Sequence, residues 1–244
     1  MGELDGCVAL VTGGSSGIGA ETARQLHAQG SHVVISARSA DGPGPDVAAG
    51  LDGEFVASDV SDPDQARRLV ETTVERHGRL DVLINSAGTT EVIAHDDLDA
   101  ATPEVWHRLY AVNVVAPWTL TAAARSWLAA SPIGAVVNVG SLSGIKPSGS
   151  SVPYGVSKAA LHQQTRMLAK ALAPTIRVNA VAPSIADTAW TAGMTEARDA
   201  AAREIPLGRM ATVDDVARVI VTQVLSPYVT GAVWRIDGGS GLTA

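Results

Sequence analysis

The sequence predicts an α/β fold in which helices cover both faces of a parallel β-sheet. Short, β-branched apolar runs recur along the 244 residues and are separated by longer segments with helical periodicity, which is typical of βαβ units. Several runs, among them VALV, HVVI and VVNV, are apolar throughout rather than alternating, as expected for strands buried on both faces. One core at this length buries roughly 70–75% of the unfolded surface. We therefore predict a single domain over residues 1–244.

Seven apolar runs account for the strands of this sheet. They are short, and turn-forming residues lie between them and the helical segments. In chain order, the predicted strands are Val8–Thr12, His32–Ser36, Glu54–Ser58, Val82–Asn85, Ala135–Val139, Arg177–Val181 and Ala232–Ile236.

The segments between the strands read as helices. Ser61, Asp62 and Thr102 stand where N-terminal caps are expected, because their side-chain oxygens accept hydrogen bonds from free helix amides. The predicted helices are Ile18–Gln29, Pro63–His77, Pro103–Ala130, Tyr154–Leu172 and Val213–Leu225.

Two segments lack periodicity. Ala40–Gly53 is rich in Gly, Pro and Asp and reads mostly as loop, so the crossover between the second and third strands should be short and irregular. Residues 184–210 are predicted to form a flap beside a site at the carboxyl ends of the strands. Within this flap, Trp190 and Met194 form either an apolar lid over a substrate or simple packing contacts.

Composition excludes several classes of function. The only cysteine, Cys7, forms no internal disulfide, and the six His lack partners at metal-ligand spacing, so we predict no metal site. The formal charge of −7 is opposite to the basic surface that nucleic acid requires. No run of about 20 apolar residues and no basic, apolar leader occurs, so we expect a cytoplasmic protein without a membrane partner.

A glycine-rich turn joins the first strand to the first helix. It reads Thr12-Gly-Gly-Ser-Ser-Gly-Ile-Gly19. Glycines let a backbone approach a pyrophosphate, and free amides at a helix N-terminus complement its charge. The spacing is G-x-x-x-G-x-G rather than G-x-G-x-x-G, and three glycines at fixed spacing arise by chance in roughly a quarter of such chains. Alone, this motif also fits a tight turn without a ligand.

A tyrosine and a lysine lie one helical turn apart at the start of a long helix. Tyr154 and Lys158 are at i and i+4, so they share a helix face. Because the chain has only three Tyr and three Lys, chance gives such a pair in about 4% of cases. A nearby ammonium stabilises a phenolate and lowers its pKa. The pair therefore indicates an acid/base catalyst.

Together these motifs resemble the short-chain dehydrogenase/reductase family. The glycine turn and the Tyr-x-x-x-Lys pair have their counterparts there, and further motifs lie in register from about Leu4 to Gly239. They are Asp59-Val60, Asn85-Ser86-Ala87-Gly88, Asn113, Ser141 and Ile236-Asp237-Gly238-Gly239.

The resemblance implies a Rossmann-type, doubly wound domain with a seven-stranded parallel sheet in the order 3-2-1-4-5-6-7. It also implies a nicotinamide cofactor, with Pro183, Ile185 and Thr188 around the nicotinamide. The implied cofactor-binding residues are Gly13, Ser15, Ser16, Gly17, Ile18, Gly19, Arg38, Asp59, Val60, Asn85, Ala87, Gly88, Tyr154, Lys158, Pro183, Ile185 and Thr188.

By the same resemblance, the chain is an oxidoreductase that interconverts a ketone and a secondary alcohol, and its substrate is a small molecule. Tyr154 is then the general acid/base, and Ser141, with Ser143 as the alternative, hydrogen-bonds the carbonyl oxygen. Lys158 lowers the pKa of Tyr154 and binds the nicotinamide ribose, and Asn113 holds a water that relays protons.

The chain departs from the family pattern at two places. Ser184 follows Pro183 where the family has glycine, so we expect the backbone near the nicotinamide to be slightly displaced. The Ala40–Gly53 stretch is shortened, but it lies beside the adenine pocket rather than the chemistry. His95-Asp96-Asp97 reads as an exposed loop rather than as a catalytic group.

The end of the second strand predicts which cofactor is used. Ala37 stands where an NAD-selective site has a carboxylate, and Arg38 follows it. A guanidinium binds a 2′-phosphate through directed hydrogen bonds. NADP(H) is therefore predicted to be preferred, with NAD(H) possible.

Three further expectations concern assembly and alternative functions. The resemblance implies a homotetramer, or a homodimer, formed through the two long helices Pro103–Ala130 and Tyr154–Leu172, which are Ala-rich enough for close packing. A non-catalytic nucleotide-binding regulatory protein of the same fold is one alternative, because a fold does not determine a function. A nucleotide-sugar epimerase or dehydratase is another, although such relatives carry an added C-terminal substrate region.

Overall fold

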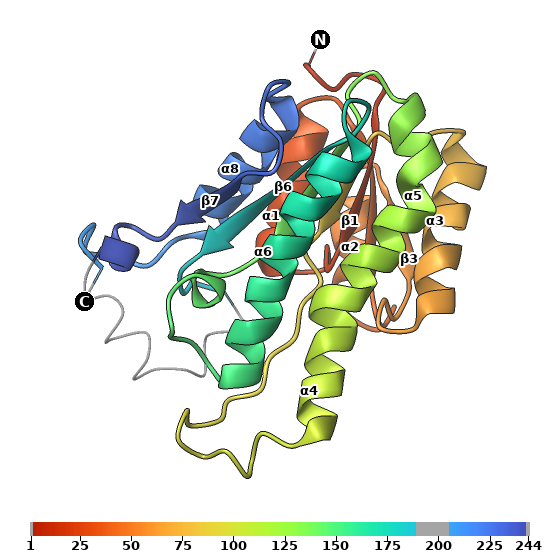
Figure 1. The fold of residues 1–244 in the computed structure, drawn as a ribbon. Coiled ribbons are helices and arrows are strands. Elements are labelled where there is room, and N and C mark those ends of the chain that lie inside the picture. Colours follow the sequence, from red (N-terminus) through yellow and green to blue (C-terminus); the bar gives the residue numbers. More distant parts are fainter. Residues whose placement is uncertain (1, 189–204, 243–244) are drawn as a thin grey trace.

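The computed structural model describes residues 2–188 and 205–242 (Figure 1). Trp190, Met194 and most of the predicted flap lie outside the described residues. The described part contains one sheet of seven strands in the order β3-β2-β1-β4-β5-β6-β7, with all neighbouring strands parallel. The predicted fold class and strand order are confirmed.

The strands lie where the apolar runs predicted them. Three have the predicted bounds, and the other four differ at one end by one or two residues. The strands are β1 (Val8–Thr12), β2 (His32–Ala37), β3 (Glu54–Ala57), β4 (Val82–Asn85), β5 (Ala135–Val139), β6 (Arg177–Pro183) and β7 (Val233–Ile236).

Five long helical segments were predicted, and the structure corrects one of them. Residues 103–130 are not one regular α-helix, because a π-helical turn, Ala111–Val115, divides the segment. The helices are α1 (Gly17–Ala28), α2 (Gly44–Ala49), α3 (Pro63–His77), α4 (Pro103–Tyr110), α5 (Ala116–Ala130), α6 (Val152–Leu172) and α8 (Val213–Leu225), with 3₁₀ turns at Leu142–Gly144 and Ser240–Leu242.

The crossover between β2 and β3 contains a six-residue helix, α2, within a stretch that reads mostly as loop. Pro45 and Asp46 stand in its first turn, where a fixed φ and a negative charge both favour a helix start. Among the predicted caps, Asp62 accepts hydrogen bonds from two amides of α3. Thr102 precedes α4 without a side-chain cap bond, and the Ser61 side chain binds Asp59 instead.

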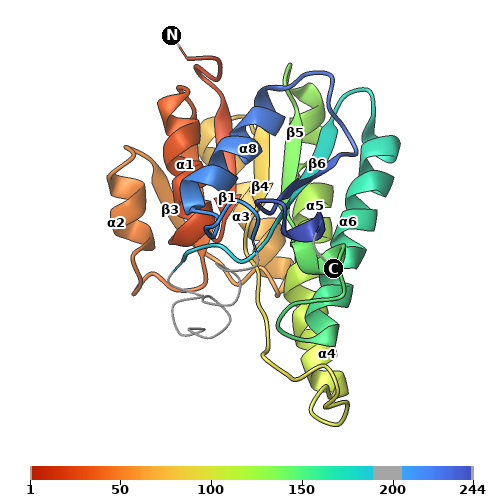
Figure 2. The same ribbon diagram turned by 90° about the vertical axis from the view of Figure 1, so that its left-hand side faces the viewer.

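The helices form a layer on each face of the sheet (Figure 2). On one face, α1, α2 and α8 pack on the sheet, and on the other face α3, α5 and α6 do so. Successive residues of β1 therefore alternate between the two cores, with Ala9 and Val11 in the first and Val8 and Leu10 in the second. Burial on both faces explains why these strands are apolar throughout.

Arg177 opens β6 and ties it to the end of α8. Its guanidinium donates hydrogen bonds to four carbonyl oxygens, those of Gln223 (2.8 Å), Val224 (2.6 Å), Ser226 (3.0 Å) and Ile133 (3.2 Å). The last carbonyls of a helix have no partner within the helix, and a positive charge complements that end of its dipole. Arg177 therefore caps α8 from the sheet.

We expect the Arg177→Met substitution to lower the free energy of unfolding by at least about 2 kcal/mol, because it leaves several part-buried carbonyls without a donor. Urea unfolding at fixed protein concentration measures this. The matched control is Arg67→Met on α3, whose arginine is exposed and pairs only with Asp64 within the described residues. An unchanged midpoint in the Arg177 variant would contradict the capping role.

Candidate active site

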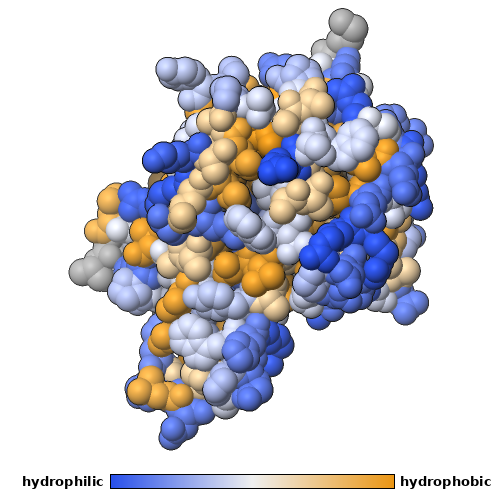
Figure 3. All heavy atoms as spheres, turned by 45° about the vertical axis from the view of Figure 1, so that its right-hand side comes forward, coloured by the Kyte–Doolittle hydropathy of each residue, from blue (hydrophilic) through white to orange (hydrophobic). Residues whose placement is uncertain are grey.

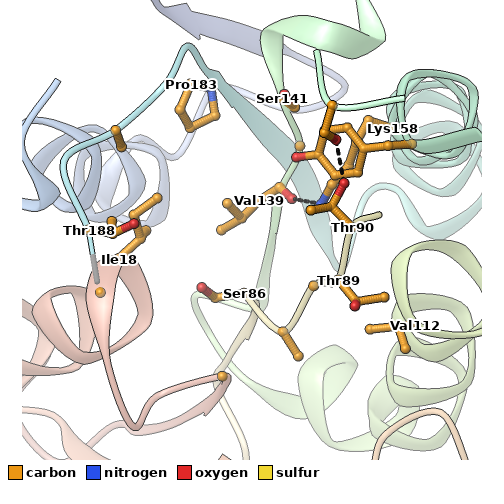
Figure 4. Close-up of a pocket in the computed structure, with 18 of the residues that line it drawn as sticks. Ile18, Ser86, Thr89, Thr90, Val112, Val139, Ser141, Lys158, Pro183 and Thr188 are labelled. Carbon is orange, nitrogen blue, oxygen red and sulfur yellow. Dashed lines mark hydrogen bonds between the residues drawn. The ribbon is translucent and has the colours of Figure 1, made fainter. Parts of the chain in front are cut away.

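A cleft of about 1770 Å³ lies at the carboxyl ends of the strands. In a parallel sheet these ends meet at one edge, so the loops that follow the strands converge there. Figure 4 shows Ile18, Pro183 and Thr188 on one side of the cavity and Thr90, Ser141 and Lys158 on the other. Residues predicted from five separate motifs therefore line one cleft.

The glycine turn forms one wall of this cleft. Gly13 has a φ of +66°, and a methyl group added to it would lie 2.8 Å from the backbone nitrogen of Ala87. Only glycine fits there, so the turn approaches the loop after β4 closely. Thr12, which sequence reasoning did not select as a site residue, holds the two loops together, because its Oγ1 accepts from the amides of Ser86 and Ala87.

The N-terminus of α1 faces the same cleft. Ser16 is the N-cap residue, and its side chain makes no cap hydrogen bond, so among the described residues it does not occupy the first helix amides. Ser15, Ser16, Gly17, Ile18 and Gly19 all line the cleft. Free amides and the positive end of the helix dipole make this wall suited to a phosphate.

Beyond the glycine turn, the cleft continues along the ends of β2 and β3. Ala37 is the last residue of β2, and Arg38 is exposed and lines the cleft. Within the described residues, Arg38 forms no ion pair or hydrogen bond. Asp59 and the buried Val60 line the same end, and the Asp59 carboxylate accepts from the amide and hydroxyl of Ser61.

Tyr154 and Lys158 lie on the first turns of α6, buried beside the cleft. Ser151 caps the helix by accepting from the Tyr154 amide, which places the tyrosine in the first turn. The Lys158 ammonium donates to the Val139 carbonyl oxygen at 2.9 Å and lies 5.8 Å from the centre of the Tyr154 ring. Val139, at the end of β5, carries no side-chain signal that could have identified it.

Ser141 follows β5 and meets Tyr154. The Ser141 side chain lies beside the Tyr154 phenol, and its Oγ accepts from the Ser143 amide at 3.2 Å. The Ser143 hydroxyl instead lies against Gly149, whose added methyl group would be 2.3 Å from it. This geometry favours Ser141 over Ser143 as the partner of Tyr154.

Burial shifts the pKa values of Tyr154 and Lys158 in opposite directions. Burial raises the pKa of Tyr154 above its ordinary value, although the neighbouring Ser141 side chain acts in the opposite direction. Burial also lowers the pKa of Lys158 to about 8. The Lys158 ammonium is directed at the Val139 carbonyl and does not offset the desolvation of the phenol, so the lowering of the Tyr154 pKa by Lys158 stays a prediction.

Asn113 lies beneath the cleft in the π-helical turn. Its amide nitrogen donates to the Thr89 carbonyl and to the Ser157 hydroxyl, and its Oδ1 accepts from the Thr89 amide. A methyl group added to Gly88 would lie 3.5 Å from both the Asn113 Oδ1 and the Lys158 Nζ. The π-turn therefore fixes the loop after β4 and places an acceptor near the lysine.

Asn85 differs from the other predicted cofactor-binding residues, because it does not line the cleft. It is buried at the end of β4, where its amide nitrogen donates to Asn138, whose amide in turn donates to Thr165. This chain of hydrogen bonds ties β4 through β5 to α6. The sequence predicted direct contact with a cofactor, but the structure gives Asn85 a place below the cleft floor.

The segment after β6 closes the other side of the cleft. Pro183, Ile185 and Thr188 line it, and Thr188 lies beside Gly17. The Ser184 amide donates to the Ile236 carbonyl at 3.0 Å, so the backbone continues its pairing with β7. Ser184 adopts a backbone conformation that needs no glycine. The expected displacement relative to the family stays a prediction.

Two buried hydroxyl groups that belong to cleft-lining residues lack hydrogen-bond partners within the described part of the chain. They belong to Ser36, next to Ala37, and to Ser184. A polar ligand that reaches both would provide partners for them. Together with the close approach at Gly13 and the free amides of α1, these groups fit an extended dinucleotide.

The loops after β4 and β5 also form the outer wall, where sequence reasoning did not select Thr90, Ile93 or Ser150 as site residues. The Thr90 and Ser150 hydroxyls hydrogen-bond each other, and the Ile93 amide donates to the Ser150 carbonyl at 2.8 Å. His95 is exposed, as predicted, but it also lines the cleft and bonds the Gly149 carbonyl at 3.0 Å. These contacts join the loops after β4 and β5 into one wall.

Residues 13–241 match the family model described as enoyl-(acyl carrier protein) reductase. The chain is 47% identical over 239 residues to a granaticin polyketide synthase putative ketoacyl reductase 2 from Streptomyces violaceoruber, covering 96% of each chain. It is 37% identical over 245 residues to the 3-oxoacyl-[acyl-carrier-protein] reductase FabG of Thermotoga maritima, covering 97% of this chain and 98% of the relative.

Solved structures show the same fold over nearly the whole chain. The Pseudomonas aeruginosa RhlG/NADP active-site complex superposes with a TM-score of 0.90 at 35% identity, over 98% of this chain and 97% of that one. A putative short-chain alcohol dehydrogenase from Sinorhizobium meliloti 1021 superposes with a TM-score of 0.91 at 32% identity, over 99% and 98%.

Proposed function

The chain belongs to the short-chain dehydrogenase/reductase family, and we propose that it is an NADP(H)-dependent oxidoreductase that interconverts a ketone and a secondary alcohol. It is an oxidoreductase of the class that acts on CH–OH and C=O groups. The observation that carries the finer proposal is the meeting of Ser141, Tyr154 and Lys158 at the cleft that the glycine turn borders. We further propose one NAD(P)-binding domain with a substrate flap near residues 184–210.

In this proposal the nicotinamide, when bound, supplies or accepts the hydride. Tyr154 donates a proton to the carbonyl oxygen in reduction and accepts one in oxidation, while Ser141 hydrogen-bonds the same oxygen. With a pKa of about 8, Lys158 is mostly protonated at neutral pH, and its charge favours the ionised phenol. Asn113 would hold a water between its Oδ1 and the lysine for proton exchange with solvent.

Pyrophosphate would bind at the glycine turn and the N-terminus of α1, and adenine at Asp59 and Val60. Arg38 would bind the 2′-phosphate. On the nicotinamide side, Pro183, Ile185 and Thr188 would hold the carboxamide. Asn85 would support this site from below rather than by contact with the cofactor.

For the substrate we propose a ketoacyl thioester. Two relatives over almost the full chain are named ketoacyl and 3-oxoacyl reductases. The outer wall of the cleft carries the Thr90 and Ser150 hydroxyls beside apolar residues such as Val92 and Ile93. Such a wall offers both hydrogen bonds for a thioester carbonyl and contact for an acyl chain.

The test is the NADPH-dependent reduction of acetoacetyl-coenzyme A beside a panel of simple ketones, followed by the loss of NADPH absorbance. We expect the thioester to be reduced with the highest kcat/KM. Absence of turnover on every carbonyl, together with tight NADPH binding, would favour the alternative of a non-catalytic nucleotide-binding protein. Faster turnover with NADH than with NADPH would favour an NAD-dependent dehydrogenase.

We also propose that the chain forms a homotetramer, with a homodimer as the alternative. Large apolar side chains are exposed on α5 and α6, among them Trp118 (53%), Trp127 (39%) and Met167 (65%). Figure 3 shows hydrophobic residues gathered in the middle of the face that carries these helices. Contiguous exposed apolar surface of this kind is typical of an interface.

Light scattering is expected to give a mass of four times 25.0 kDa at micromolar concentration. Trp118→Asp should shift the mass towards smaller species, because it places a charge in the centre of the proposed interface. The exposed Tyr228 lies outside α5 and α6, so Tyr228→Asp is the control that should leave the mass unchanged. A wild-type mass near 25.0 kDa would contradict the proposal.

No helix among the described residues is long and apolar enough to cross a membrane. The cytoplasmic location stays a prediction.

A further inference from the structure

His162 is a buried histidine that the proposed mechanism does not use. It lies on α6, four residues after Lys158 and eight after Tyr154, and is 2% exposed. Residues at this spacing follow one another along one helix face. A single helix therefore presents Tyr154, Lys158 and His162 towards the sheet edge where the cleft lies.

The imidazole packs against the loop that carries Ser141. Its Nε2 accepts a hydrogen bond from the Ser141 amide at 3.4 Å. A methyl group added to Gly140 would lie 2.1 Å from the same nitrogen, and one added to Gly144 would lie 2.8 Å from Cε1. The ring thus fills space that Gly140 and Gly144, on either side of Ser141, leave open.

The ring acts as an acceptor because it is neutral. Burial lowers the pKa of His162 to about 4, and the positive charges of Lys158 and Arg166 act in the same direction. In the neutral ring one nitrogen donates and the other accepts. Since Nε2 accepts from the Ser141 amide, the proton resides on Nδ1 at neutral pH.

The same loop meets α6 a second time, at the site itself. The Ser141 side chain lies beside Tyr154, which precedes His162 by eight residues on the helix. His162 holds the backbone of Ser141, and Tyr154 lies beside the Ser141 side chain. Because His162 and Tyr154 are both on α6, this rigid helix sets the separation between the Ser141 and Tyr154 hydroxyls.

We propose that His162 is a positioning residue that holds the Ser141 backbone, by accepting from its amide and by filling the space between Gly140 and Gly144, so that the serine hydroxyl meets Tyr154. The inference rests on the proposed function, in which Ser141 and Tyr154 act on the same carbonyl oxygen. Small displacements of such groups reduce turnover by up to about 10²-fold.

Two substitutions separate the hydrogen bond from the packing. His162→Met fills the space but has no comparable acceptor, whereas the side-chain oxygen of His162→Gln reaches about as far as Nε2 and accepts. We expect kcat of the Met variant to fall by about tenfold or more, with KM and the Kd for NADPH changed less than about twofold. The Gln variant should recover most of kcat.

The second readout is hydrogen exchange at the Ser141 amide, which needs no substrate. Exchange should be faster in the Met variant and close to wild type in the Gln variant. The matched control is Gln223→Met on α8, which also replaces a fully buried polar side chain and removes its hydrogen bond to Ala180. It should lose stability but keep both kcat and the protection of Ser141.

Equal kcat in the Met variant and the wild type would overturn the proposal, and so would equal impairment of the Met and Gln variants, because a packing role predicts no rescue. Unchanged exchange at Ser141 in the Met variant would overturn it as well. If the wild type reduces no carbonyl, the proposed function fails by itself, and amide exchange still decides whether His162 holds the Ser141 backbone.

Discussion

The Tyr154→Phe variant is expected to lose at least about 10²–10⁴-fold in turnover while it folds and binds NADPH as the wild type does. The substitution keeps the ring, which lies in the first turn of α6, and removes only the hydroxyl. Without that hydroxyl, no group in the proposed mechanism delivers a proton to the carbonyl oxygen. The loss should therefore fall on kcat rather than on binding.

Steady-state kinetics on a confirmed substrate, with the Kd for NADPH measured by fluorescence titration, check this expectation. Tyr228→Phe is the matched control, because Tyr228 is fully exposed and does not line the cleft. It should change neither quantity. Near-full activity of the Tyr154 variant would show that another group moves the proton, and a loss of NADPH binding would indicate a structural role.

Much of the fold follows from local patterns in the sequence. The strands are apolar throughout because helices cover both faces of the sheet, so their positions were predictable within one or two residues. The glycine turn and the Tyr154–Lys158 pair were also recognisable, because each depends on a short spacing that one turn or one helix face preserves. Parallel strands then bring these motifs to one edge.

Other features depend on contacts that a local pattern does not contain. The π-helical turn at Asn113 lies inside a continuous helical pattern, and its position follows from hydrogen bonds to Thr89 and Ser157. The pKa of Tyr154 depends on its burial, which the spacing to Lys158 does not reveal. Asn85 likewise stands in a recognisable motif, but its partner Asn138 lies on another strand.

The choice between the two nicotinamide cofactors is expected to depend on Ala37 and Arg38. A carboxylate at the end of β2 accepts from a ribose 2′-hydroxyl and repels a 2′-phosphate, and Ala37 provides neither effect. The Arg38 guanidinium lines the cleft and forms no ion pair within the described residues, so its hydrogen-bond donors remain available to a phosphate. The wild type should therefore bind NADPH more tightly than NADH.

The Ala37→Asp variant should weaken NADPH binding by about 10²-fold or more, because two negative charges a few ångströms apart repel strongly in a partly desolvated cleft. Its Kd for NADH should change by less than about fivefold, since the new carboxylate has a hydroxyl to accept from. Arg38→Gln should weaken NADPH binding by about tenfold or more and leave NADH binding unchanged.

The matched control for charge is Arg24→Gln on α1, whose arginine is exposed and pairs with Glu21 outside the cleft. It removes the same charge from the chain. An effect on cofactor binding that Arg24→Gln shares with Arg38→Gln therefore reflects the electrostatic field of the whole protein rather than a contact with the cofactor. Fluorescence titration of the wild type and of each variant, with NADPH and with NADH, gives the dissociation constants to be compared. Equal or tighter binding of NADH by the wild type would refute the assignment, because the end of β2 has no carboxylate to accept from the 2′-hydroxyl and is followed by Arg38, which favours the phosphate.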